Sequence, residues 1–188
     1  MTGPGAPAPR ASALGMVIFL ASLSMLFAAG IVGYLVIRFR AESWPPAGAP
    51  ALPRALWFST IVALLVSVAV QMALRSIRAG KQRALLRWLS AAVLLTVSFL
   101  AVQSLNWTQI LGQPSFDASL YGFTFIMLTG LHGAHALGGL VALVVVWILA
   151  RRGSYSWAHY PGVRNCSLYW HYLTAVWLVL FGLLLTTF

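Results

Sequence analysis

The chain of 188 residues is 61% hydrophobic and only 7% charged, which excludes an ordinary soluble domain, since such domains are about 25% charged. Its formal net charge of +10 comes from twelve basic and two acidic residues. The basic residues cluster between apolar runs instead of alternating with acids on a folded surface, which argues against nucleic-acid binding and is typical of membrane proteins.

The apolar runs predict an all-α polytopic membrane protein with five transmembrane helices. Residues 1–13 are rich in Pro, Gly and Ala, and we expect them to form a mobile N-terminal tail. The first apolar run is longer than the core of a signal peptide, about 7–15 residues, so it should remain as a membrane helix. Residues 14–188 then form one domain. Its predicted spans are approximately residues 14–37, 55–74, 88–110, 118–149 and 166–187.

The positions of Lys and Arg predict how these five spans are oriented. Nine basic residues fall on the side of the N-terminus and three on the opposite side. The nine are Arg10, Arg75, Arg78, Lys81, Arg83, Arg87, Arg151, Arg152 and Arg164, and the three are Arg38, Arg40 and Arg54. The positive-inside rule therefore places the N-terminus in the cytoplasm and the C-terminus outside.

The fourth span carries a polar face and a face of small residues within an apolar helix. Gly130, Ala134 and Gly138 recur every four residues, which predicts a stripe that lets another helix come close. His132 and His135 are three residues apart and so lie at neighbouring positions on the helix surface. We expect polar contacts from these histidines to a neighbouring helix or to lipid headgroups.

The predicted spans contain no Asp, Glu, Lys or Arg, the groups on which proton relays and ion pathways depend. Of the titratable groups, His132, His135 and His171 remain. His171 lies near the start of the fifth span and His135 deeper in the fourth, so the three do not obviously converge on a metal or haem, which stays the minor alternative. No nucleophile–base set is present, and the sequence predicts a membrane subunit without an active site of its own.

Two stretches, TGLHGAHALGG in the fourth span and LYWHYLTAVWLVLF in the fifth, resemble the signature stretches of cytochrome c oxidase subunit III. The positions that match are Thr129, Gly130, His132, Gly133 and His135, then Tyr169, Trp170, His171, Tyr172 and Trp177. The first span is similar to the opening Gly-Met-x-x-Phe helix of that family. The resemblance covers nearly the whole chain, and its length is that of the short bacterial form, which lacks the first two of seven helices.

The resemblance implies a non-catalytic subunit of a haem–copper respiratory oxidase in the bacterial inner membrane. Haem and copper would belong to the catalytic partner, subunit I, with none in this chain, and phospholipids would be bound. The electron donor would be cytochrome c or quinol. We expect helix packing or partner contact from Gly130, Ala134, Gly138 and Trp177. We expect contact with lipid, or polar contact with another subunit, from His132, His135, Trp170, His171, Arg151 and Arg152.

Three positions depart from the family, which has acidic residues where this chain has Leu23, Asn106 and Thr174. Proton or gating roles that depend on those acids are therefore not carried over. The loss slightly favours an alternative, an accessory subunit of a nitric oxide reductase. A free-standing small-molecule transporter is less favoured, since no internal repeat is visible. A haem-binding electron carrier is a further alternative.

Overall fold

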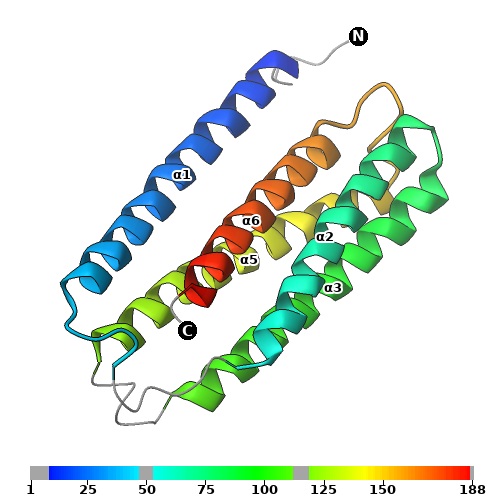
Figure 1. The fold of residues 1–188 in the computed structure, drawn as a ribbon. Helices are drawn as coiled ribbons and strands as arrows, with labels where there is room; N and C mark the ends of the chain where they lie inside the picture. The colour runs from blue at the N-terminus through cyan, green and yellow to red at the C-terminus, as the bar shows by residue number, and fades with distance from the viewer. Residues whose placement is uncertain (1–8, 47–52, 112–118, 187–188) are drawn as a thin grey trace.

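The computed structural model describes residues 9–46, 53–111 and 119–186, and these residues form a bundle of long α-helices (Figure 1). The helices are α1 (Pro9–Arg40), α2 (Ala55–Arg78), α3 (Gln82–Ile110), α5 (Leu120–Arg151) and α6 (Pro161–Leu185). Each is long and apolar enough to cross a membrane. The prediction of an all-α protein with five spans is confirmed.

The helices extend beyond several of the predicted spans. α2 continues to Arg78 and α3 begins at Gln82, so most of the basic segment expected to be a loop is helical. α1 begins at Pro9, inside the expected tail, and α6 begins at Pro161 instead of residue 166. The reason is that apolarity marks the length inside the hydrocarbon, whereas a helix can continue among headgroups, where basic side chains are favourable. Residues 1–8, 118 and 187 of the predicted elements lie outside the described part of the chain.

Two glycines end helices at the same end of the bundle. Gly80 follows α2 with a φ of +67°, and the next amide, of Lys81, donates to the carbonyl of Ser76 at 2.9 Å. Gly153 follows α5 with a φ of +74° and the same arrangement of bonds. This is the Schellman motif, whose left-handed residue is usually Gly because it has no Cβ. The two motifs turn the chain back toward the bundle.

α2 and α3 form an antiparallel hairpin, α6 packs on α2, and α5 packs on α3 and α6. α1 lies along the edge of the bundle and packs mainly on α5 and α6 (Figure 1). Only 11% of its most apolar window is buried, against 44% for α2 and for α6. α1 therefore presents most of its surface to lipid or to a partner.

A few polar and aromatic contacts attach α1 to α6. The hydroxyl of Ser24 donates to the Tyr172 hydroxyl at 3.1 Å, and Phe19 stacks on Tyr169 with ring centroids 6.1 Å apart. At the other end of α1, the guanidinium of Arg38 donates to the backbone carbonyl of Thr186 at 3.0 Å. This carbonyl follows the last turn of α6, where a cation is favoured by the helix dipole.

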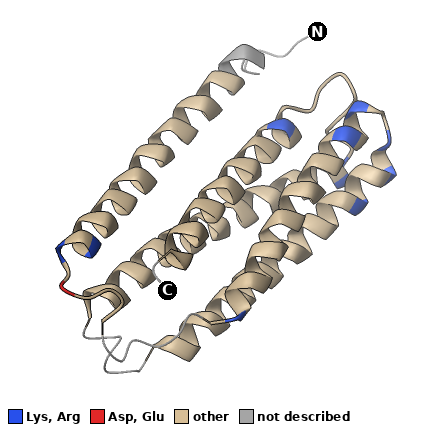
Figure 2. Ribbon diagram, viewed as in Figure 1, with Lys and Arg blue, Asp and Glu red and all other residues tan. Residues whose placement is uncertain are grey.

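Most of the Lys and Arg residues in the described part of the chain lie at one end of the bundle, where α2 and α5 end and α3 and α6 begin (Figure 2). Fewer basic residues lie at the opposite end, where α1 ends. The turns that follow α2 and α5 lie at the same end of the bundle, as the order of the predicted spans requires. The orientation across the membrane, with the N-terminus in the cytoplasm and the C-terminus outside, stays a prediction.

Candidate functional site

His132 lies inside the bundle, enclosed by aromatic rings from three other helices. It is 2% exposed, and the ring centroids of Trp177 (α6), Phe99 (α3) and Phe27 (α1) lie 4.9, 5.7 and 6.3 Å from its own. Trp177 is also fully buried, and its Nε1–H donates to Oγ1 of Thr60 on α2 at 3.0 Å. Both residues therefore join helices within this chain. Their burial favours packing over contact with a lipid headgroup.

His135 is half-buried and joins α5 to both α1 and α6. Its Nδ1 lies 2.7 Å from the carbonyl of Leu131, and its own carbonyl accepts a hydrogen bond of 2.7 Å from the Tyr169 hydroxyl. Its ring centroid is 5.2 Å from that of Phe27. Since a carbonyl oxygen only accepts, Nδ1 carries the proton and Nε2 is left as an acceptor.

His171 faces α2, away from the other two histidines. Its Nδ1 lies 2.5 Å from Oγ of Ser67, and its Nε2 lies 3.0 Å from Oε1 of Gln71. Because an amide oxygen only accepts, Nε2 donates to Gln71 and Nδ1 accepts from the Ser67 hydroxyl. Among the described residues, no group of three or more His, Cys, Asp or Glu side chains could hold a metal ion. The structure assigns His171 a role in joining α2 to α6.

The stripe Gly130, Ala134 and Gly138 is not where α5 meets the other helices of this chain. A Cβ added at Gly130 or Gly138 would have no atom within 4 Å, and Ala134 is exposed. The stripe is therefore open, and close packing of a helix against it stays a prediction about a partner chain.

The glycines of α5 that neighbours do approach closely are Gly133 and Gly139. A Cβ at Gly133 would lie 3.2 Å from the ring of Trp107 on α3. A Cβ at Gly139 would lie 2.6 Å from Tyr169 and 3.0 Å from Trp170, both on α6. Trp170 is itself 4% exposed, so it packs against α5 within the chain.

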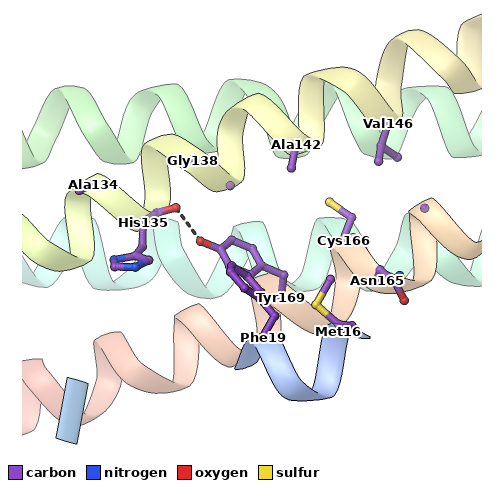
Figure 3. A pocket seen from close by; sticks show the side chains of 12 residues that line it. Met16, Phe19, Ala134, His135, Gly138, Ala142, Val146, Asn165, Cys166 and Tyr169 are labelled. Atoms are coloured by element: carbon purple, nitrogen blue, oxygen red, sulfur yellow. Dashed lines mark hydrogen bonds between the residues drawn. The ribbon is translucent and has the colours of Figure 1, made fainter. Parts of the chain in front are cut away.

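An apolar cavity of about 370 Å³ lies between α1, α5 and α6 (Figure 3). Met16 and Phe19 of α1 line one side, and Ala142 and Val146 of α5 line another. His135, Tyr169 and the small residues Ala134 and Gly138 also border it (Figure 3). Sequence reasoning missed this cavity, because it arises from the position of α1 and not from a local pattern.

Arg151 and Arg152 are exposed at the end of α5, at the basic end of the bundle. The guanidinium of Arg151 lies 4.8 Å from the ring centroid of Trp147, and the Nε1–H of Trp147 donates to Oγ of Ser90 on α3 at 2.8 Å. The cation–π contact holds Arg151 along the helix. Arg152 caps the helix.

The three positions at which the resemblance led us to expect acidic residues are all buried. Leu23 is 7%, Asn106 0% and Thr174 6% exposed. Oγ1 of Thr174 donates to the carbonyl of Ala63 on α2 at 3.3 Å, and Nδ2 of Asn106 donates to Oε1 of Gln103 at 3.3 Å. Neutral residues therefore occupy positions where a carboxylate would be costly without a partner.

Comparison with known proteins gives a match over nearly the whole chain. The family described as cytochrome c oxidase subunit III matches residues 8–186. The chain is 30% identical over 175 residues to a cytochrome c oxidase subunit 3 of Synechocystis, covering 92% of this chain and 74% of the relative. It is 29% identical to that of Thermostichus vulcanus, covering 94% and 87%, and 30% identical to a probable subunit 3 of Nocardia farcinica, covering 93% and 87%.

Proposed function

Because this chain belongs to the cytochrome c oxidase subunit III family, we propose that it is the non-catalytic, stabilising subunit of a haem–copper respiratory oxidase. The observation that carries the proposal is the family match over residues 8–186, which includes the histidine motif built into the core of the bundle. Haem and copper would belong to the catalytic partner, which reduces oxygen. The named relatives are oxidase subunits and do not favour the nitric oxide reductase alternative.

The open stripe on α5 supports contact with the catalytic subunit. Gly130 and Gly138 have no neighbour within 4 Å of a Cβ position, and Ala134 is exposed. Small residues along a membrane helix allow backbones to approach closely, and van der Waals packing is a main source of helix association in lipid. Since Ala134 and Gly138 also border the cavity between α1, α5 and α6, we place the partner helix at the Gly130 end of this stripe.

The apolar cavity and the basic end of the bundle support binding of phospholipid. The cavity of about 370 Å³ is lined mainly by apolar side chains of α1, α5 and α6, so an acyl chain suits it. Arg151 and Arg152 lie exposed where α5 ends. A basic side chain near anionic lipid contributes about 1 kcal/mol, so this end would hold headgroups on the inner face of a bacterial plasma membrane.

Deleting this chain tests the stabilising role. We expect the remaining complex to keep its full haem and copper content, to lose phospholipid and to inactivate sooner during turnover. The measurement compares metal and haem content, lipid content and activity lifetime of the purified complexes. Unchanged lipid content and unchanged lifetime would contradict the proposal, and so would loss of haem.

Filling the cavity tests the lipid site separately. Ala142→Phe places a ring in the cavity, and we expect less phospholipid to co-purify with the complex. The control is Val141→Phe, at the neighbouring residue, which is 61% exposed and does not line the cavity. Equal lipid content in the two variants would exclude this cavity as a lipid site without affecting the assignment of the subunit.

A further inference from the structure

Three buried side chains at the junction of α3 and α5 have polar atoms without a hydrogen-bond partner. They are Nε2 of Gln103, Oδ1 of Asn106 and Nδ1 of His132. The three residues are 1%, 0% and 2% exposed, so neither lipid nor bulk water reaches them. Buried polar groups in folded proteins are nearly always paired, either with protein or with an ordered water molecule. The cluster therefore calls for a ligand that can pair with all three atoms.

The two amides of α3 present one donor and one acceptor whichever way they are turned. Nδ2 of Asn106 donates to Oε1 of Gln103 at 3.3 Å, which leaves the Gln103 nitrogen and the Asn106 oxygen unpaired. If both amides were flipped, Gln103 would donate to Asn106, and the Asn106 nitrogen and Gln103 oxygen would be left over. The requirement for an acceptor and a donor is thus independent of the amide assignment.

The contacts on either side of Gln103 place it opposite the turn of α5 that carries His132. One turn before it, the ring of Phe99 lies 5.7 Å from that of His132. One turn after it, Nε1–H of Trp107 donates to Oγ1 of Thr129, three residues before His132, at 3.1 Å. Residues four apart lie on one face of a helix, so Gln103 projects between these two contacts.

No other described side chain around His132 offers its Nδ1 a partner. The rings that enclose it belong to Phe27, Phe99 and Trp177, and the indole N–H of Trp177 already donates to Thr60. The nearby His135 uses its own Nδ1 for the carbonyl of its helix. The spans contribute no charged side chain to this junction.

We propose that a water molecule is bound inside the bundle between α3 and α5, bridging the Gln103–Asn106 amide pair and His132. It accepts from Nε2 of Gln103 and donates to Oδ1 of Asn106 and to Nδ1 of His132. Three bonds are the usual number for a buried structural water. His132 is then the neutral tautomer with its proton on Nε2. The water site lies beyond the proposed subunit role and does not depend on it.

A structure of the purified oxidase complex, at a resolution that reveals internal waters, tests the site without changing the protein. We expect density for one water within hydrogen-bond distance of all three residues. Well-ordered side chains of Gln103, Asn106 and His132 with no density between them would overturn the proposal. Direct bonding of Nδ1 of His132 to either amide would also overturn it.

The sign of a stability change gives a second test. If the three atoms were merely unpaired, His132→Phe would remove a buried ring nitrogen that has no partner and raise the temperature at which the chain is lost from the complex. If a water links them, the same variant breaks a network, and we expect a fall of about 2–6 °C. Retention of the chain after heating, followed by immunoblot, measures the effect. Should this variant fail to assemble, the wild-type structure decides the question alone.

Two further variants control this measurement. Ser104→Ala changes the residue that follows Gln103 on α3, whose exposed hydroxyl donates to the carbonyl of Leu100 in its own helix, and we expect no shift. Gln103→Leu combined with Asn106→Leu and His132→Phe removes every partner of the water. We expect this triple variant to lose less than the sum of the single losses, because no polar group stays unpaired. Strictly additive losses would contradict a shared ligand.

Discussion

The hydroxyl of Ser67 on α2 lies 2.5 Å from Nδ1 of His171 on α6, in a hydrogen bond that spans 104 positions of the sequence. The other ring nitrogen of His171 donates to Gln71, which lies one turn further along α2. Since the ring is rigid and both nitrogens are used, this pair of bonds fixes how α2 and α6 are placed along each other. His171 therefore holds two helices of this chain together.

Replacing His171 should therefore loosen the α2–α6 contact. His171→Phe removes both bonds and leaves the amide oxygen of Gln71 unpaired, so we expect the free energy of unfolding to fall by about 1–3 kcal/mol. Unfolding of the purified chain in mixed micelles of increasing SDS content measures it. The control is Ser98→Ala, whose exposed hydroxyl bonds only to the carbonyl of Leu94 in its own helix. Equal losses of stability in the two variants would contradict the role of His171 in holding α2 and α6 together.

Two adjacent glycines of α5 should respond differently to the same substitution. A Cβ at Gly139 would lie 2.6 Å from Tyr169 and 3.0 Å from Trp170, so Gly139→Ala should destabilise the chain by about 1–3 kcal/mol through overpacking. A Cβ at Gly138 meets nothing within 4 Å, so Gly138→Ala should change stability by no more than about 0.5 kcal/mol. The same unfolding assay compares them, and similar losses would show that the α5–α6 contact is misplaced.

The open stripe predicts a variant that folds but does not assemble. Gly130 has space around its Cβ position within this chain, so Gly130→Leu should leave the thermal unfolding midpoint of the isolated chain close to wild type. If a partner helix packs there, we expect the variant to co-purify with the catalytic subunit at a level reduced by about tenfold or more, since 1.4 kcal/mol corresponds to a factor of ten.

The control for assembly is Ala101→Leu, a small residue that is exposed on α3. We expect it to assemble normally. Loss of the partner in Ala101→Leu, together with normal assembly of Gly130→Leu, would place the intersubunit face on α3 and refute the stripe.

The charge asymmetry predicts the location of the C-terminus. Nine basic residues on the side of the N-terminus against three on the other place that terminus in the cytoplasm. Alkaline phosphatase is active only outside the cytoplasm, so we expect high activity when it is fused after Phe188 and low activity when it is fused in the turn after α2, at Gly80. The reverse pattern would invert the topology.

The long spans could be predicted because a run of about 20 apolar residues has few other uses. The helix ends could not, because polar and charged residues such as Gln82 and Arg78 look like a loop in the sequence but continue a helix among headgroups. The available sequence signal for the turn was Gly80, which adopts a left-handed backbone conformation in the structure.

The site was only partly predictable. A buried histidine among aromatic rings, such as His132, and a lone polar residue in an apolar run, such as Gln71, both suggest a bond between helices but do not identify the partner. The sequence could not distinguish the glycines against which another helix packs from those with open space beside them. Gly138 and Gly139 are adjacent and differ only in which side of α5 they occupy. That distinction depends on where α6 lies.

The attachment of α1 to α5 and α6 has a consequence for biogenesis. Of the helices that the structure describes, α1 is synthesised before the two on which it docks, while α2 and α3 can pair as soon as both are inserted. Until α5 is inserted, Phe27 of α1, 2% exposed in the finished chain, lacks the rings of His132 and His135 on which it packs. A nascent chain halted after α3 would therefore have α2 and α3 paired but α1 without its packing partners. This partly assembled chain is the form that membrane proteases and chaperones would encounter.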